Sequence, residues 1–228
     1  SYKTDLISKG GGVFDRAAKH IELSLAVQEV LGLHIGACSG ESLIRAILKA
    51  PVDLLYNGGI GTYIKASFET DHDAQDPVNN TVRVDANTLR CKVLSEGGNL
   101  GLTQASRIEF AQQGGILNTD AIDNAAGVNM SDHEVNLKIL LMNEPFKRRN
   151  KLLIGVAEQV AEQCLNDNRE QAVALSLAQL TAEQHLPRLL HLQHFLNEEN
   201  HEFELEKEEN IALRPVLSEW LGYEKNRV

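Results

Sequence analysis

The sequence has 228 residues, of which 43% are hydrophobic and 24% charged. These proportions are those of ordinary globular chains of one or two domains, and they exclude collagen-like, low-complexity and wholly disordered classes. The formal net charge of −10 opposes binding to nucleic acid or to an anionic membrane surface, and no apolar run reaches the roughly 18 residues of a membrane span. We therefore expect a cytoplasmic protein with no nucleic-acid or membrane partner.

Short apolar runs at 52–56 and 91–94 predict two buried strands of a parallel sheet. The first run leads into a glycine cluster at 57–61, and the second into another at 97–101. A third short run at 115–118 follows. The fold class that this pattern predicts is α/β, a parallel sheet with flanking helices.

Helical patterns accompany these strands. One covers residues 41–50, and another covers 103–111, with Thr103 as its N-cap and Gly114 as its stop. Between the two strands, residues 68–89 are rich in Asp and Asn, which predicts a polar loop or a short helical detour.

After Pro145 the glycines almost disappear and apolar residues recur at helical spacing. We therefore predict two parts, an α/β part at 1–144 and an α-helical C-terminal region at 145–228. Thr181 has the capping-box spacing that begins a helix, Pro215 suits the start of the last one, and the acidic run at 198–209 has no assigned role.

A third polar cluster, residues 118–134, precedes this region. There Ser131 is expected to N-cap a helix, with Glu134 completing a capping box.

No metal site is expected from the sequence. The three cysteines are an odd number at long spacings without paired CxxC clusters, and His133-Glu134 lacks the second His of a helical zinc motif.

The glycine clusters are the main indication of chemistry, because ligands of open α/β sheets bind at the carboxyl ends of the strands. Two interpretations remain open: the glycines let a ligand approach the backbone, or they only make tight turns. Neither cluster matches GxGxxG, so the pyrophosphate-binding turn is not expected in this chain.

Three long motifs, at 52–66, 95–104 and 118–136, strongly resemble the NAD-specific glutamate dehydrogenases of the large-subunit bacterial class. The resemblance extends to 6–14 and to Arg214-Pro215, and it is loosest between 183 and 211.

The resemblance implies NAD as the cofactor, and it identifies residues 1–144 as the later part of an NAD-binding domain with a partial Rossmann-like sheet. It places Asn99 beside the nicotinamide ring, and Asn57, Gly58 and Gly59 at the nicotinamide ribose and carboxamide. These four residues are the predicted cofactor-binding residues.

The resemblance also implies L-glutamate and 2-oxoglutarate as ligands, with the Ser131 hydroxyl on the γ-carboxylate and Val128 in the pocket wall. Ala125 departs from the class, whose members commonly carry Ser there. The family's catalytic Lys and Asp belong to a preceding domain, so no catalytic residue is assigned in this chain.

We thus expect a fragment of an enzyme, a homo-oligomer at full length, that oxidatively deaminates L-glutamate to 2-oxoglutarate and ammonia with NAD. The fragment alone is expected to be inactive, and the missing initiator Met fits an excised piece. Two alternatives remain: a dehydrogenase for another amino acid, and a non-catalytic regulatory or assembly module.

Overall fold

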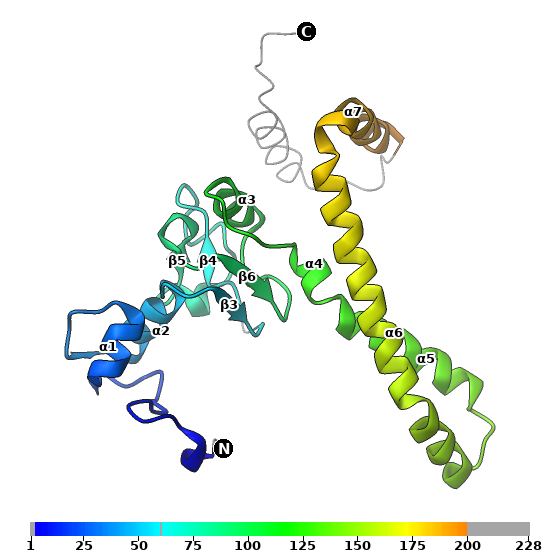
Figure 1. Ribbon diagram of the computed structural model, residues 1–228, viewed down its shortest axis with the longest axis horizontal. Coiled ribbons are helices and arrows are strands. Elements are labelled where there is room, and N and C mark those ends of the chain that lie inside the picture. Colours follow the sequence, from blue (N-terminus) through cyan, green and yellow to red (C-terminus); the bar gives the residue numbers. More distant parts are fainter. Residues whose placement is uncertain (1–2, 60, 200–228) are drawn as a thin grey trace. The chain divides into compact units, whose positions relative to one another are not determined.

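The computed structural model describes residues 3–59 and 61–199 (Figure 1). The chain divides into two compact units, the first ending at Thr119 and the second beginning at Asp120. The α/β class with flanking helices and a helical C-terminal region is confirmed. The domain boundary predicted at 144/145 falls inside the second unit, in the turn between the helices at Ala125–Leu140 and Phe146–Leu180.

The first unit begins with a small antiparallel layer. After a 3-10 turn at Thr4–Leu6, β1 (Ile21–Glu22) pairs with β2 (Ala37–Cys38). Helices α1 (Leu25–Leu31) and α2 (Gly40–Leu48) follow these strands. Each helix is capped by a serine hydroxyl that accepts a backbone N–H three residues on, as good N-caps do. The buried side chains of this layer form one apolar cluster: Ile21, Leu23, Leu31, Leu43 and Ala50.

The predicted parallel strands are confirmed. Strand β3 (Leu54–Asn57) lies beside β6 (Val93–Glu96) in Figure 1, and the two are parallel, with Asn57 opposite Glu96. On the other side of β6, Ile116 forms a parallel bridge with Val93, so the third apolar run also joins the sheet.

The expected burial of β3 is wrong for one of its faces. Leu54 is 56% exposed and Tyr56 is 63% exposed, although parallel strands are normally covered on both faces. The rest of the described chain leaves that face uncovered, and β6 is the only strand that pairs with β3 among residues 3–59 and 61–199.

A second parallel pair, β4 (Ile64–Lys65) and β5 (Val84–Asp85), lies in the main core with α3 (Gln104–Gln112). Residues 68–89 form turns with 3-10 segments at Pro77–Asn79 and Ala86–Thr88, and they also supply β5, which the sequence did not predict. The fully or nearly buried members of the core are Leu48, Tyr63, Ile64, Val82, Val84, Ala86, Cys91, Leu94, Leu102 and Phe110.

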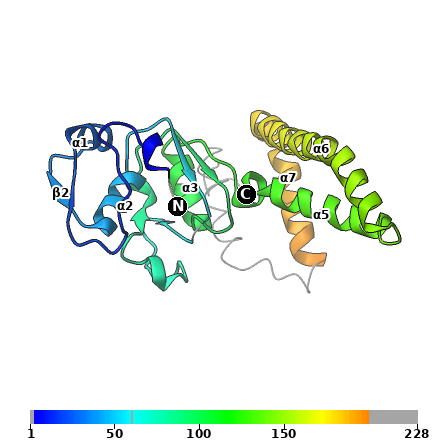
Figure 2. The same ribbon diagram turned by 90° about the horizontal axis from the view of Figure 1, so that it is seen from below.

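The second unit is helical. It consists of α4 (Asp120–Asp123), α5 (Ala125–Leu140), α6 (Phe146–Leu180) and α7 (Ala182–Glu199). Helix α5 packs against α6, and Figure 2 shows the two side by side. In the part of the chain that the structure describes, no helix is both long enough and apolar enough to cross a membrane.

One predicted helix start in this unit is wrong. Ser131 is inside α5, because the helix begins six residues earlier at Ala125. The helix start predicted at Thr181 is confirmed, because α7 begins at Ala182, but the Thr181 hydroxyl donates to the carbonyl of Leu177 at 2.8 Å and does not cap α7. Pro215 and all but the first two residues of the acidic run 198–209 lie outside the described residues.

Candidate functional site

The two glycine clusters lie together at the carboxyl ends of β3 and β6. Because Asn57 is opposite Glu96 in a parallel pair, both loops leave the sheet at the same level. Gly97 N–H donates to the carbonyl of Asn57 at 2.7 Å, and the Thr62 hydroxyl donates to the carbonyl of Leu100 at 2.7 Å. The structure therefore brings Asn57, Gly58 and Gly59 to the loop that contains Asn99.

The glycines of these loops differ in whether the surrounding structure leaves room for a side chain. Gly59 has a φ of +83°, and a Cβ on it would lie 2.6 Å from the Cα of Gly98. A Cβ on Gly98 would in turn lie 2.5 Å from the Cα of Gly59, and one on Gly97 would overlap the hydroxyl of Tyr56. In contrast, a Cβ on Gly58 would meet no atom within 4 Å. Turn and packing requirements thus explain Gly59 and Gly98, whereas a side chain at Gly97 would meet only the end of the exposed Tyr56 side chain and one at Gly58 would meet nothing.

The Asn57 side chain holds an unpaired donor. The residue is 8% exposed, and its Oδ1 accepts the N–H of Gly59 at 3.1 Å, which fixes the orientation of the amide. Its Nδ2 is buried and has no hydrogen-bond partner among the described residues. Leaving a buried donor unsatisfied costs about 1–3 kcal/mol, so such an atom at a loop edge indicates a place where a ligand acceptor can bind.

Asn99 is exposed on the same loop, directly before a residue with unusual backbone geometry. Leu100 has a φ of 59° although it is not a glycine, and its side chain is 65% exposed. Residues other than glycine rarely adopt this left-handed conformation, and it is commonest at functional sites.

Beneath the loop lies a buried ion pair that the sequence analysis did not identify. Glu96 is 1% exposed, and its two carboxylate oxygens accept from Arg107 Nε at 2.8 Å and Arg107 Nη2 at 3.0 Å. A usable signal was present in the sequence, because a carboxylate that ends a buried strand needs a cationic partner.

The polar excursion 68–89 supports the other loop. Arg83 is buried, and its Nε donates to the carbonyl of Thr62 at 2.9 Å while its Nη1 pairs with Asp71 at 2.7 Å. The Asp76 carboxylate accepts the N–H of Thr62 at 2.9 Å and the Nδ2 of Asn79 at 2.6 Å. The hydrogen bond from Asn79 contributes most to lowering the pKa of Asp76; Thr62 and Arg83 lower it further, and burial opposes them.

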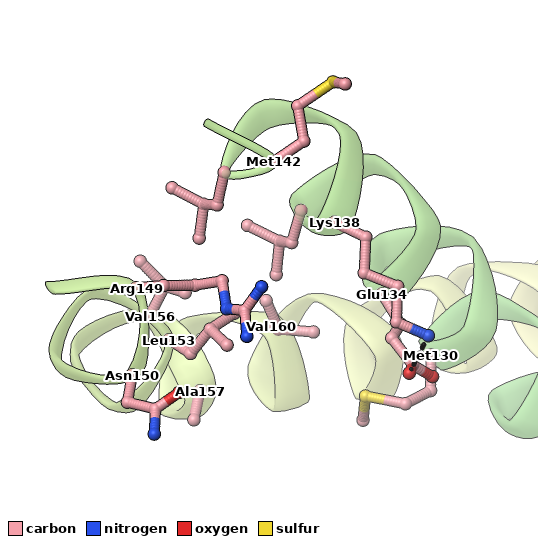
Figure 3. Close-up of a pocket in the computed structure, with 12 residues that line it drawn as sticks. Met130, Glu134, Lys138, Met142, Arg149, Asn150, Leu153, Val156, Ala157 and Val160 are labelled. Atoms are coloured by element: carbon pink, nitrogen blue, oxygen red, sulfur yellow. Dashed lines mark ion pairs between the residues drawn. The ribbon is translucent and has the colours of Figure 1, made fainter. Parts of the chain in front are cut away.

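The two predicted substrate residues are on α5, in the second unit. Val128 is 61% exposed, and Ser131, also exposed, follows one turn later on the same helix face. The contact between α5 and α6 also forms an apolar groove of about 840 Å³, shown in Figure 3 with the Glu134–Lys138 ion pair of 2.6 Å at its edge. Neither Val128 nor Ser131 lines this groove.

The cysteines show no disulfide and no reactive environment. All three are free, and burial raises the pKa of the Cys91 thiol, which favours its protonated form.

An α/β chain with paired glycine loops at the carboxyl ends of parallel strands is typical of nucleotide-dependent enzymes. Residues 1–178 match the family model described as bacterial NAD-glutamate dehydrogenase, catalytic domain. The chain therefore belongs to the bacterial NAD-glutamate dehydrogenase family.

Curated relatives agree with this assignment. The chain is 49% identical over 191 residues to a protein named NAD-specific glutamate dehydrogenase from Halomonas elongata, a match that covers 80% of this chain. Proteins of the same name from Pseudomonas aeruginosa and Mycobacterium tuberculosis are 49% and 48% identical over 81% and 82% of the chain. In each comparison the match covers 12% of the relative's length.

Proposed function

We propose that this chain is part of an enzyme that oxidatively deaminates L-glutamate to 2-oxoglutarate and ammonia with NAD. The chain supplies the loops that bind the nicotinamide half of NAD and a helix that binds glutamate. The unpaired Nδ2 of Asn57 beside an unobstructed Gly58 is the observation that carries the proposal. The names of the relatives, NAD-specific glutamate dehydrogenase, support the same reaction and cofactor.

The residues present fit the nicotinamide half of NAD. The buried Nδ2 of Asn57 offers a hydrogen-bond donor, and the open side of Gly58 lets a flat ring or ribose approach the backbone. Gly59 and Asn99 complete the proposed cofactor-binding set on the two adjoining loops. NAD, when bound, accepts the hydride from the substrate, while these residues bind and orient it.

We propose that Ser131 and Val128 bind the side chain of the substrate. A serine hydroxyl can donate to a carboxylate, and a hydrogen bond to a charged group is worth about 1.5–3 kcal/mol. An enzyme for leucine or another apolar amino acid gains nothing from that hydroxyl, which favours glutamate over the alternative dehydrogenase.

The activity is proposed for a longer polypeptide. The chain spans about 12% of the length of its curated relatives, and we propose that the catalytic Lys and Asp lie in a preceding domain. We therefore propose that the chain alone is inactive and that the full-length enzyme is a cytoplasmic homo-oligomer.

The test is NADH formation at 340 nm by the full-length protein, with L-glutamate or L-leucine and with NAD or NADP. We expect turnover with L-glutamate and NAD. In the Ser131→Ala variant, loss of a hydrogen bond to a charged group should raise the KM for glutamate by roughly tenfold or more. Ser176→Ala is the matched control, because its hydroxyl donates only to the carbonyl of Ala172 within α6.

No turnover of any amino acid by a folded full-length protein would contradict the proposal and favour the regulatory or assembly module. Turnover of leucine in preference to glutamate would favour the alternative dehydrogenase.

A further inference from the structure

The Glu96–Arg107 pair is nearly inaccessible to solvent: Glu96 is 1% exposed and Arg107 6%. The two hydrogen bonds of 2.8 and 3.0 Å make it bidentate, the geometry in which a guanidinium fixes both the position and the plane of a carboxylate. A buried ion pair is a weak stabiliser, because desolvation offsets most of its Coulomb energy. Its presence therefore calls for a role other than stability alone.

The position of the carboxylate indicates that role. Glu96 directly precedes loop 97–101, and its Oε1 also accepts the N–H of Leu102 at 3.2 Å, so one carboxylate holds both ends of the loop. A Cβ on Gly101 would lie 2.9 Å from Glu96 Oε1 and 2.5 Å from Asn57 Nδ2. The same small space thus borders both the carboxylate and the unpaired amide.

The guanidinium is itself held from a helix. Arg107 is in the first turns of α3, whose N-cap Thr103 accepts the N–H of Ser106 at 3.2 Å. The Nη1 of Arg107 donates to Gln104 Oε1 at 3.0 Å, so the guanidinium is also held on the side that does not face Glu96.

We propose that Arg107 is a positioning residue of the nicotinamide site. It fixes the Glu96 carboxylate, which fixes loop 97–101 and with it the position of Asn99 on that loop. This inference rests on the proposed function. Arg107 is not a catalytic residue, because it acts only through Glu96.

The test uses the full-length enzyme and compares Arg107→Met, Arg107→Lys and Ser106→Ala. Loss of the fork lets the loop shift, and a misplacement of about 1 Å can cost on the order of a hundredfold in rate. We expect Arg107→Met to raise the KM for NAD at least about tenfold, with the KM for glutamate within about twofold of the parent. Arg107→Lys, which keeps the charge without the fork, should recover part of the loss.

Ser106→Ala is the matched control on the same helix. Its side chain is fully buried and donates to the carbonyl of Thr103, so its loss should lower the melting temperature but leave the KM for NAD unchanged. The dissociation constant of NADH, measured by its fluorescence without glutamate, should follow the KM for NAD in all three variants.

Each outcome is decisive. An unchanged KM for NAD in folded Arg107→Met overturns the proposal, and if that variant does not fold, an unchanged KM in Arg107→Lys does so. If the unsubstituted enzyme itself fails to reduce NAD with glutamate, the proposed function has failed, and this inference fails with it. An equal rise in the KM for NAD in Ser106→Ala would show a general effect of disturbing α3 and would also overturn it.

Discussion

Single residues in the two loops divide into those that shape the loops and those that face outward. Gly59 is needed for its left-handed backbone and for the contact with Gly98, whereas Gly58 has neither constraint. Asn57 belongs to both groups, because its Oδ1 is used in the turn and its Nδ2 is not. A glycine repeat alone does not separate these roles.

We predict that alanine lowers the free energy of unfolding strongly at one of two neighbouring glycines and hardly at the other. Gly59→Ala should lower the free energy of unfolding by about 2 kcal/mol or more, because it combines left-handed strain with a clash against Gly98. Gly58→Ala should change it by less than about 0.5 kcal/mol, as at other unconstrained surface positions. Urea unfolding followed by circular dichroism measures both.

Cofactor binding should show an effect of Gly58 that stability does not. In the full-length enzyme, Gly58→Ala should raise the KM for NAD while the protein remains as stable as the parent. A normal KM for NAD in Gly58→Ala would show that no ligand approaches the backbone there.

Among the elements, the excursion 68–89 was predicted least well from the sequence. Its many Asp and Asn residues indicate a solvated loop, yet Arg83 and Asn79 are buried and Val82 is fully enclosed in the core. The polar side chains are satisfied by one another and by the loop after β3, which is long-range pairing that composition does not encode.

The excursion should loosen in acid. The lowered pKa of Asp76 means that its stabilising contribution is present above the ordinary value of 3.8 and is lost as the pH falls through the lower folded-state value. Asp76→Asn should therefore be less stable than the parent at pH 7, and the difference should shrink below pH 3.8. Melting temperatures measured from pH 7 to pH 3 test this, and a constant difference would contradict it.

Local signals predicted α2, β3, β6 and α3 of the first unit, but not its two-residue strands or α1. Thr103 caps α3 as expected, and the apolar runs became β3 and β6 with the predicted parallel pairing. In the second unit the capping signal marked the start of α7 after Thr181 but failed for Ser131, which lies inside α5. The proximity of the two glycine loops could be predicted from the parallel strands that precede them. The Glu96–Arg107 ion pair could be identified only from the three-dimensional structure.

At the scale of the whole molecule, the two buried apolar clusters found among residues 3–59 and 61–199 both lie in the first unit. We therefore predict that residues 1–119 alone unfold in a single cooperative urea transition. Leu94→Ala should lower the unfolding free energy by about 2–5 kcal/mol, because this side chain is 1% exposed in the core. Leu54→Ala, on the paired strand but 56% exposed, should change it far less.

A gradual, non-cooperative loss of circular dichroism by residues 1–119 would contradict this prediction. It would show that the first unit depends on chain beyond residue 119 for its packing.

The contact between Gly59 and Gly98 has a consequence for how such genes can recombine. The two positions are far apart in the reading frame, yet a methyl group on either would collide with the other's backbone. A crossover between them is harmless only if both parental genes encode glycine at both positions. The intervening segment is thus inherited with its two ends as one unit, and chimeric enzymes should be joined outside it.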